Sequence, residues 1–489
     1  MKIKKYTYVT LFIAGSVLIN SCAVNPVTGK KQVVLMSEAQ EIAMGKDADP
    51  QIIAQYGLYD NKDLQSFITR EGKKMAAISH RPNLAYEFKI VDSEVLNAFA
   101  TPGGYVYFTR GIMANFNNEA QFAGVLGHEI GHITARHTVS QQRNQLLGQI
   151  GLIAGMVLAP RLGQFADQAS QGLGLLFLKF GRDAENQADQ LGAEYSSRVG
   201  FDADQMADFF TTLERESESS GKPGLPDFLS THPNPGGRYS AVRKAAAEWK
   251  QKLNLTNAQI NRNTYLKRIE GIVYGEDPKQ GFVENSIFYH PVLKFQFPIP
   301  SQWAHQNSPQ QFQMAPKDGK AMMMLMLAPG KTLQEAASGV LQQYNLQALE
   351  TKEINVNSLN AIAMVADVKT DPNQQQQQQQ QVVRTLSYVI QQGNLFYLMI
   401  GVTGSNTFNN YVPVFTSAMQ NFKTLTDVAK INKKPQRIRL KTVTKTQTLE
   451  QVLKSYKVED RKLNQLAILN GLKLSDKIAP GTMIKVIGE

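Results

Sequence analysis

The chain has 489 residues, a length that exceeds one ordinary domain and predicts two to four domains. Hydrophobic residues make up 42% and charged residues 19% of it, and these proportions exclude a disordered chain. The single cysteine, Cys22, excludes an intramolecular disulfide. Any metal site must therefore be built from the seven histidines and the carboxylates.

The net charge of +11 is confined to the two ends of the chain. Lys2, Lys4 and Lys5 contribute three positive charges near the N-terminus. Residues 428–489 hold fourteen Lys or Arg against five Asp or Glu, so residues 22–427 carry a net charge of −1. Because the body of the chain is not basic, we expect no nucleic-acid partner.

Residues 1–21 resemble a bacterial lipoprotein signal peptide. After the three lysines come an apolar stretch from about Val9 to Leu18 and the short segment Ile19–Ser21, which leads to Cys22. In such a lipobox the cysteine is lipidated and becomes the first residue of the mature protein, so the resemblance implies a membrane anchor. Ala23 stands where an aspartate would signal inner-membrane retention in enteric-type bacteria. We therefore expect the periplasmic face of the outer membrane; an ordinary signal peptide with a chance cysteine is the alternative.

The mature chain contains no run of the ~18–20 apolar residues that a membrane-spanning helix needs. Leu146 to Ala159 comes nearest, but Gln149 interrupts it and Pro160 ends it. We expect this segment to touch a membrane surface or to cover a groove.

The first predicted domain, residues 22–275, is mainly helical, because apolar residues recur at helical spacing in five segments. These segments are 36–46, 62–79, 118–138, 184–199 and 203–215. Two extended runs, Phe88–Val91 and Tyr105–Phe108, lie on either side of the turn Pro102–Gly104 and predict a small sheet.

From residue 284 to 427 the pattern predicts an α/β or α+β sandwich. The expected strands are Phe295–Phe297, Ala321–Leu327, Ala361–Val368, Val383–Ile390 and Leu395–Gly401, with helices at about 332–345 and 409–421. The octaglutamine tract Gln374–Gln381 cannot pack in a core, so we expect it in a solvated hairpin loop.

After a linker at Lys430–Pro435, residues 436–489 predict a small basic module of strand, helix, helix and strand. Its positive charge is expected either to be merely solvated or to bind anionic polymers of the cell envelope.

The motif that carries the chemistry is His128-Glu129-Ile130-Gly131-His132, inside the helical run 118–137. Histidines four residues apart lie about 40° apart around a helix, so both imidazoles face one ion. Glu129 reaches a metal-bound water without itself binding the metal. Gly131 and Gly127 each cost a helix about 1 kcal/mol relative to alanine, so we expect a close approach of backbone or substrate there. His137 lies off the ligand face and is not expected to be a ligand.

A catalytic zinc takes three protein ligands and keeps one open position, so another element must supply a ligand. The segment Arg182–Asp189 places Glu185 and Asp189 on one helix face. Glu185 would complete a His-His-Glu set, and Asp189 would accept the outer N–H of a ligand histidine. A solvated acidic face is the alternative, and it fits poorly with the apolar run Leu173–Phe180 just before it.

Three motifs together resemble the HtpX-like and BepA-like zinc metallopeptidases, relatives of the CAAX prenyl proteases. They are HEIGH at 128–132, RDAENQAD at 182–189 and STHPNPGGR at 230–238. Ala23–Lys30 and Asn97–Gly104 are similar to the periplasmic lipoprotein branch of that family. The resemblance covers roughly residues 23–270 and implies a mainly α-helical zincin-type domain with one zinc ion per chain. Its ligands would be His128, His132 and Glu185, and Glu129 would be the general base.

Two further regions resemble known modules. Residues 284–427 are similar to the PsbP-like α/β sandwich. Residues 437–489, with Thr448-Leu449, Leu469–Leu472 and Pro480-Gly481, are similar to LysM-type modules, which bind glycan. This second resemblance implies peptidoglycan as a partner, although Thr446-Gln447 replaces the usual Gly-Asp.

These motifs predict a membrane-anchored zinc metalloendopeptidase of a bacterial cell envelope that degrades misfolded or misassembled envelope proteins. Arg238 is the candidate cation beside the developing oxyanion. Tyr105–Phe108 is the candidate segment for pairing with an extended substrate as an added strand. A non-proteolytic chaperone or assembly factor, or a cell-wall-anchored scaffold that keeps the peptidase fold, is the alternative.

His232 lies in a loop rich in glycine and proline, which the family resemblance places near the zinc. As a fourth ligand it would close the site and make the enzyme latent until the loop moved. As a turn residue or a transition-state hydrogen-bond donor it would have no such role. The sequence leaves both readings open.

Overall fold

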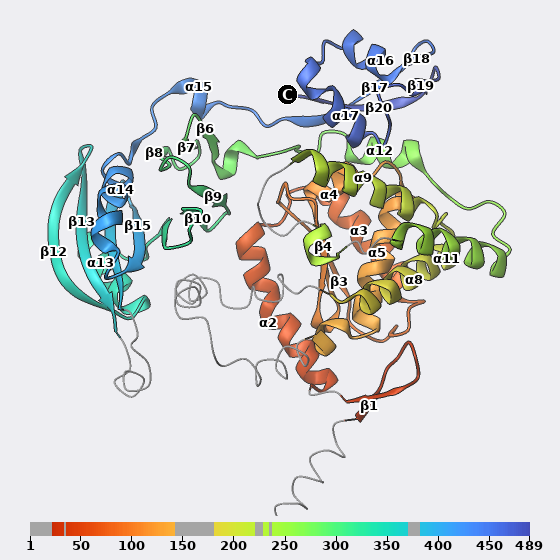
Figure 1. Ribbon diagram of the computed structural model, residues 1–489, viewed down its shortest axis with the longest axis horizontal. Helices are drawn as coiled ribbons and strands as arrows, with labels where there is room; N and C mark the ends of the chain where they lie inside the picture. The colour runs from red at the N-terminus through yellow and green to blue at the C-terminus, as the bar shows by residue number, and fades with distance from the viewer. Residues whose placement is uncertain (1–21, 34–35, 142–179, 221–227, 234–236, 370–381) are drawn as a thin grey trace, which may run out of the picture.

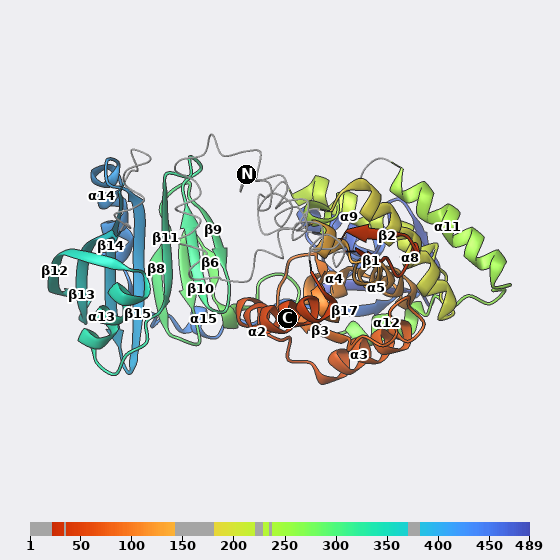
Figure 2. The same cartoon turned by 90° about the horizontal axis from the view of Figure 1, so that it is seen from below.

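The computed structural model describes residues 22–33, 36–141, 180–220, 228–233, 237–369 and 382–489 (Figure 1). The predicted signal peptide, the apolar segment Leu146–Ala159 and the octaglutamine tract lie outside these ranges. Within them, none of the helices has the length and hydropathy required to cross a membrane. The chain is multidomain: a helical body, a sheet-rich sandwich and a small C-terminal module (Figures 1 and 2).

The helical body surrounds a small three-stranded sheet. Its helices are α2 (Glu38–Tyr56), α3 (Lys62–Ala76), α4 (Arg110–Asn115), α5 (Glu119–Thr134), α8 (Arg182–Arg198), α9 (Gln205–Ser220), α10 (Phe228–Thr231), α11 (Arg238–Lys252) and α12 (Arg262–Ile269). Its strands are β3 (Glu87–Val91), β4 (Ala98–Thr101) and β5 (Tyr105–Thr109), and a hairpin of β1 (Cys22–Val24) and β2 (Lys31–Val33) precedes them.

The three strands are ordered β3-β5-β4, so β5 is the central strand. It pairs in parallel with β3 and antiparallel with β4. The prediction that Tyr105–Phe108 adds a substrate strand is therefore wrong, because both of its hydrogen-bonding edges are already paired within the sheet. The edge strand nearest the HExxH helix is β4, which packs beside α5.

Glycines let α5 and α8 pack closely. A Cβ on Gly127 would lie 3.0 Å from the backbone oxygen of Gly192, and one on Gly131 would lie 3.0 Å from Leu191 Cβ. In the opposite direction, a Cβ on Gly192 would lie 3.0 Å from Gly124 O and 3.1 Å from the backbone nitrogen of His128. The absence of a side chain at Gly127 is therefore explained by the close approach of the α8 backbone, and that at Gly131 by the Leu191 side chain of α8.

The sandwich is built on a seven-stranded antiparallel sheet. Its order is β12 (Leu346–Val356), β13 (Leu359–Val368), β14 (Val383–Gln392), β15 (Leu395–Gly404), β11 (Ala321–Leu327), β10 (Gln311–Ala315) and β9 (Ala304–Asn307). A four-stranded sheet lies beside it, ordered β16 (Lys423–Thr424), β8 (Phe295–Pro298), β7 (Ile287–His290) and β6 (Phe282–Glu284). Strands β13 and β14 are antiparallel neighbours, so the chain between them, which carries the glutamines, joins the two arms of a hairpin.

Two hydrophobic cores lie on opposite faces of the large sheet. Helix α13 (Leu333–Gln343) covers one face, where Met324, Val389 and Ile400 are buried. Helix α14 (Phe408–Gln420) and the four-stranded sheet cover the other face, where Met323 and Met399 are buried. Successive strand residues point to opposite faces, so the continuous apolar runs of β11 and β15 serve both cores.

The C-terminal module packs directly on the helical body. Its elements are β17 (Arg437–Thr442), β18 (Gln447–Thr448), α16 (Leu449–Ser455), α17 (Leu463–Leu469), β19 (Lys477–Ile478) and β20 (Met483–Gly488). Ile438, Leu466 and Ile484 of the module belong to one buried cluster with Phe116 and Phe209 of the body. The sequence predicted a separate module behind a linker; in the structure the two share a core beside α9 and α12, on the side away from β1 (Figure 1).

Candidate metal centre

Helix α5 carries both histidines of the HExxH motif and begins at a well-defined cap. The side chain of Asn118 accepts a hydrogen bond from the backbone N–H of Gln121 at 2.8 Å. Every residue of α5 is buried, including its polar residues, so the helix is packed on all sides inside the body. The helix ends at Thr134, earlier than the sequence predicted, because Arg136 adopts a left-handed backbone conformation (φ 57°).

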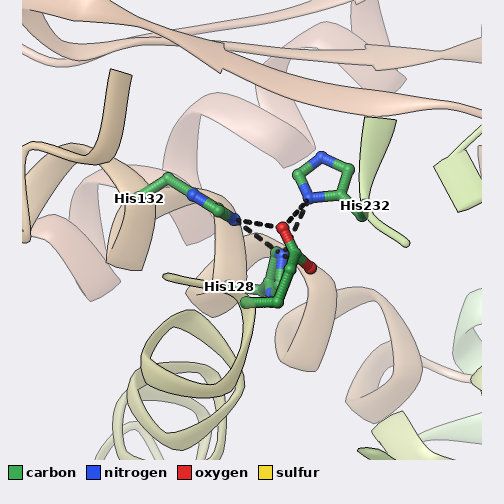
Figure 3. A group of neighbouring side chains, drawn as sticks. His128, His132 and His232 are labelled. Atoms are coloured by element: carbon green, nitrogen blue, oxygen red, sulfur yellow. Dashed lines mark hydrogen bonds and ion pairs between the residues drawn. The ribbon is translucent and has the colours of Figure 1, made fainter. Parts of the chain in front are cut away.

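Four buried side chains direct a ligand-type atom toward one point: His128, His132, Glu185 and His232. His128 Nε2 lies 3.0 Å from His132 Nε2 and 3.2 Å from His232 Nδ1. Glu185 Oε1 lies 3.0 Å from His232 Nδ1 and 3.5 Å from His132 Nε2. Figure 3 shows the three imidazoles turned toward one another.

This donor set suits a tetrahedral zinc ion. Zinc binds histidine nitrogen and carboxylate oxygen at about 2.0–2.2 Å, which puts neighbouring ligand atoms about 3.4 Å apart. The separations in the cluster bracket that value. A single cation at this point could take a lone pair from each of the four side chains at once.

The surroundings of the cluster lower the pKa of one of its histidines and raise the pKa of another. Burial, together with the neighbouring histidines, lowers the pKa of His132 well below its usual value. Burial also lowers the pKa of His232, but the carboxylates of Glu185 and Glu129 outweigh burial and raise it above the usual value. A cation bound among these groups would take the place of the proton on His232, because the same two carboxylates attract it.

Asp189 and Arg238 form a layer behind the ligands. Asp189 Oδ1 lies 2.9 Å from His128 Nδ1, the contact that the sequence predicted. Because a carboxylate only accepts, His128 Nδ1–H donates and leaves Nε2 free to face the cluster. Burial raises the pKa of Asp189, but hydrogen bonds from His128 and Arg238 outweigh burial and leave it below its usual value.

The guanidinium of Arg238 is buried and its donors are engaged. Nε and Nη2 each donate to Asp189 at 2.7 Å, and Nη1 lies 3.0 Å from Glu185 Oε2. Nη1 also donates to the carbonyls of His232 and Pro233, at 3.1 and 3.2 Å. This geometry places Arg238 behind two site carboxylates and the His232 backbone; the sequence had suggested a place beside the substrate.

His137 is the site residue that the sequence analysis missed. Its Nδ1 lies 3.0 Å from the outer nitrogen, Nδ1, of His132, and its Nε2 lies 2.9 Å from Gln187 Oε1 on α8. Burial lowers the pKa of His137 to about 4, so it is neutral at ordinary pH. Helical spacing put His137 off the ligand face, but α5 ends at Thr134, and the turn at Ala135-Arg136 places His137 against the outer nitrogen of His132.

Glu129 is fully buried beside the cluster, and His232 Nε2 lies 3.7 Å from its Oε1. Neither carboxylate oxygen has a hydrogen-bond partner among the described residues. Burial raises the pKa of Glu129, which makes the carboxylate a stronger base than an exposed one. A buried carboxylate without protein donors fits a group that acts on water or substrate.

Two neighbouring elements support the cluster from outside. Phe228 of α10 stacks on the His232 ring with centroids 4.5 Å apart, and its carbonyl accepts from the His232 backbone N–H at 2.7 Å. At the far end of α5, the amide of Asn25 donates to the carbonyl of Ala135 at 3.3 Å. The N-terminal Ala23–Lys30 motif is thus fastened close to the metal-site helix.

The metal cluster lies in a part of the chain that is similar to known metallopeptidases. Residues 62–246 match the family model described as Peptidase family M48. The match spans α3 to α11 and therefore includes all four residues of the cluster.

Among curated proteins, the chain is similar to the beta-barrel assembly-enhancing protease of Yersinia pestis, at 31% identity over 237 residues. That alignment covers 46% of this chain and 48% of the relative. The protein of the same name from Escherichia coli strain K12 is 28% identical over 241 residues, 48% of each chain. The mitochondrial metalloendopeptidase OMA1 of Schizosaccharomyces pombe is 29% identical over 248 residues, 49% of this chain and 68% of that protein. The chain thus spans about half the length of the bacterial relatives.

Among solved structures, a cyanobacterial PsbP from Synechocystis matches 29% of this chain and 96% of its own, with 10% identity and a TM-score of 0.23. A score this low supports no argument about fold. The PsbP-like and LysM-like resemblances therefore stay predictions.

We predict one zinc ion per chain, lost in His128→Ala, His132→Ala and Glu185→Ala because each removes a ligand atom. His137→Ala should keep the ion but weaken its binding by about 10–100-fold, since it only orients His132. Metal analysis and competition with a chelator measure both effects. Full zinc content in His132→Ala would contradict the assignment.

Proposed function

We propose that this protein is a zinc-dependent endopeptidase of a bacterial cell envelope that cleaves misfolded or misassembled envelope proteins. The observation that carries the proposal is the convergence of His128, His132 and Glu185 beside the Glu129 carboxylate, which has no hydrogen-bond partner in the part of the chain that the structure describes. The M48 match of residues 62–246 and the metallopeptidase relatives support the same chemistry.

In the proposed reaction, His128, His132 and Glu185 would hold the zinc ion, and Asp189 and His137 would orient the two imidazoles. When bound, zinc supplies a Lewis acid that polarises water and the carbonyl of the scissile peptide. The Glu129 carboxylate takes a proton from the attacking water and delivers it to the leaving amine nitrogen. Burial around Glu129 excludes bulk water from these proton transfers.

The edge of β4 is the proposed place for an extended substrate. It is the strand beside α5, and its outer edge faces away from β5. Pairing there would use main-chain hydrogen bonds, which are indifferent to side-chain identity and suit unfolded polypeptides. Arg238 would act on substrate only indirectly, by holding Asp189 and Glu185 in place.

The cellular setting remains part of the proposal. The lipobox-like sequence before Cys22 supports a lipid anchor, and the relatives named as beta-barrel assembly-enhancing proteases support an outer-membrane setting. Peptidoglycan or another anionic polymer is the proposed partner of residues 436–489, based on their charge.

We expect the wild-type protein to cleave casein, an unfolded soluble substrate, and Glu129→Gln to be slower by at least about 100-fold with zinc retained. The matched control is Glu194→Gln on α8, which removes a carboxylate paired with Arg198 outside the metal cluster. Undiminished cleavage by zinc-loaded Glu129→Gln would exclude Glu129 as the base. Substrate protection without cleavage by the wild type would favour the chaperone alternative.

Cys22→Ala should release the protein from the membrane fraction and leave casein cleavage intact, because anchoring would rest on the acyl chains alone. Fractionation of cells and an activity assay on the soluble pool measure the two effects. A variant that stays fully membrane-bound would point to the segment Leu146–Ala159 instead.

His232 is proposed to hold the site in a latent state. Its Nδ1 lies within 3.2 Å of His128 Nε2 and 3.0 Å of Glu185 Oε1, so it stands in the position of a fourth ligand. Four protein ligands would leave no position for water, as in a structural zinc site. The backbone N–H of Phe228, at the start of the same segment, donates to Leu96 O just before β4. Movement of this segment would therefore free both the metal and the start of the substrate edge.

His232→Ala should accordingly raise casein cleavage and self-cleavage several-fold without loss of folding, because the fourth position opens. His305→Ala, a histidine of the sandwich, is the control. If activity instead falls in a folded, zinc-loaded His232→Ala protein, His232 is a transition-state donor and the latent state does not exist.

A further inference from the structure

A lysine of the C-terminal module is buried in the body of the protein, at the turn from which the HExxH helix starts. Lys485 of β20 has no exposed surface. Its Nζ lies 2.9, 3.3 and 3.1 Å from the carbonyl oxygens of Ala114, Asn115 and Phe116. These carbonyls end helix α4 and have no following helical turn to bind them, so the ammonium caps the helix.

The same turn is held by further groups from distant parts of the chain. The amide of Asn117 donates to Leu469 O of the module at 3.3 Å. Arg262 of α12 donates to Asn117 O and to Met483 O of the module, both at 3.2 Å. Together with Lys485, these contacts tie residues 114–117 to the module at three separate places.

The backbone of Lys485 is itself fixed within the module. Asn470, at the end of α17, accepts from the Lys485 backbone N–H at 2.7 Å and donates to its carbonyl at 2.8 Å. This pair of bonds sets the direction of the lysine side chain. Asn470 belongs to the Leu469–Leu472 motif that the sequence analysis singled out and that the proposed reaction does not use.

A buried ammonium group is less favourable in a core than an apolar side chain, because it loses its contacts with water. Burial, and to a smaller extent the nearby charge of Arg262, lowers the pKa of Lys485 well below its usual value. An apolar residue of similar length would avoid this cost. The three N–H donors of the ammonium match three carbonyl acceptors. Unlike an apolar residue, the lysine therefore holds the turn in one orientation through hydrogen bonds.

The turn leads directly into α5. Asn118, the N-cap of α5, follows the last residue that the module contacts, and Gln121 Oε1 accepts from the Asn117 backbone N–H at 2.7 Å. From Asn118 to His128 is ten residues of continuous helix, about 15 Å. A fully buried helix moves as a unit, so a shift at its first turn displaces both metal-site histidines.

We propose that Lys485 is a positioning residue for the metal centre, and that the C-terminal module is a working part of the peptidase because it fixes, through Lys485, the start of α5. The inference rests on the proposed zinc chemistry of α5. It assigns the module a role in catalysis that is independent of any glycan.

The test compares Lys485→Met, which keeps length and loses the three donors, with Lys477→Met on β19 of the same module, where the lysine is exposed. In the full-length zinc protein, Lys485→Met should lower kcat on casein-derived peptide about tenfold and leave KM within about twofold, because displaced ligands impair chemistry more than binding. Lys477→Met should match the wild type. With cobalt in place of zinc, the visible absorption of Lys485→Met should differ from that of the wild type, which reports ligand geometry without relying on turnover.

A second variant covers the case in which Lys485→Met does not fold. Asn117→Ala removes the contact with Leu469 O from the other side of the turn and should lower kcat in the same direction by a smaller factor. Wild-type kcat and an unchanged cobalt spectrum in a folded Lys485→Met, or in Asn117→Ala where the first variant is unfolded, would overturn the proposal. A wild-type protein that binds cobalt but cleaves nothing would refute the proposed function, and the spectra would still decide the role of Lys485.

Discussion

The candidate metal centre depends on one close packing contact, that of α5 against α8. Two of its donors come from the first helix and one from the second, so the cluster exists only while the two backbones stay near contact. Gly127 and Gly192 permit this approach, because a Cβ on either would lie within 3.0 Å of a backbone oxygen of the other helix. Alanine at these positions would favour an isolated helix by about 1 kcal/mol yet push the helices apart. Glycine therefore lowers the helix propensity of α5 and α8 at the positions where the metal centre requires the two backbones to lie close together.

Behind the ligands, a buried layer of charges sets their orientation. Arg238 binds Asp189 through two nitrogens, and Asp189 in turn receives the outer N–H of His128. Buried ion pairs are weak evidence for stability, since the cost of desolvation rivals the attraction between the charges. Their value here is geometric: Asp189 binds the outer ring nitrogen of His128 and so directs the other ring nitrogen toward the cluster. His137 performs this function for His132.

The domains contribute unequally to this site. The sandwich has its own two cores on the faces of the seven-stranded sheet and lies to one side of the helical body (Figures 1 and 2). The C-terminal module instead shares the core of the body and reaches the first turn of α5. A module whose apolar side chains complete another domain's core cannot be removed without exposing that core to water.

Local spacing along the sequence was sufficient to predict the helix with His128 and His132 and the pair Glu185 and Asp189, because each follows from the period of one element. It also predicted five of the eleven described strands of the sandwich, β8, β11, β13, β14 and β15, but not the long edge strand β12. What depends on how elements meet could not be predicted. Helical spacing excluded His137 as a ligand, but it could not show that the break at Arg136 brings His137 into contact with the outer nitrogen of His132. Tyr105–Phe108 has the pattern of a strand, but only the sheet order makes it central. Lys485 is one of fourteen basic residues near the C-terminus, and only tertiary packing buries it at the turn before α5, since no short-range pattern records a contact between residues 370 positions apart.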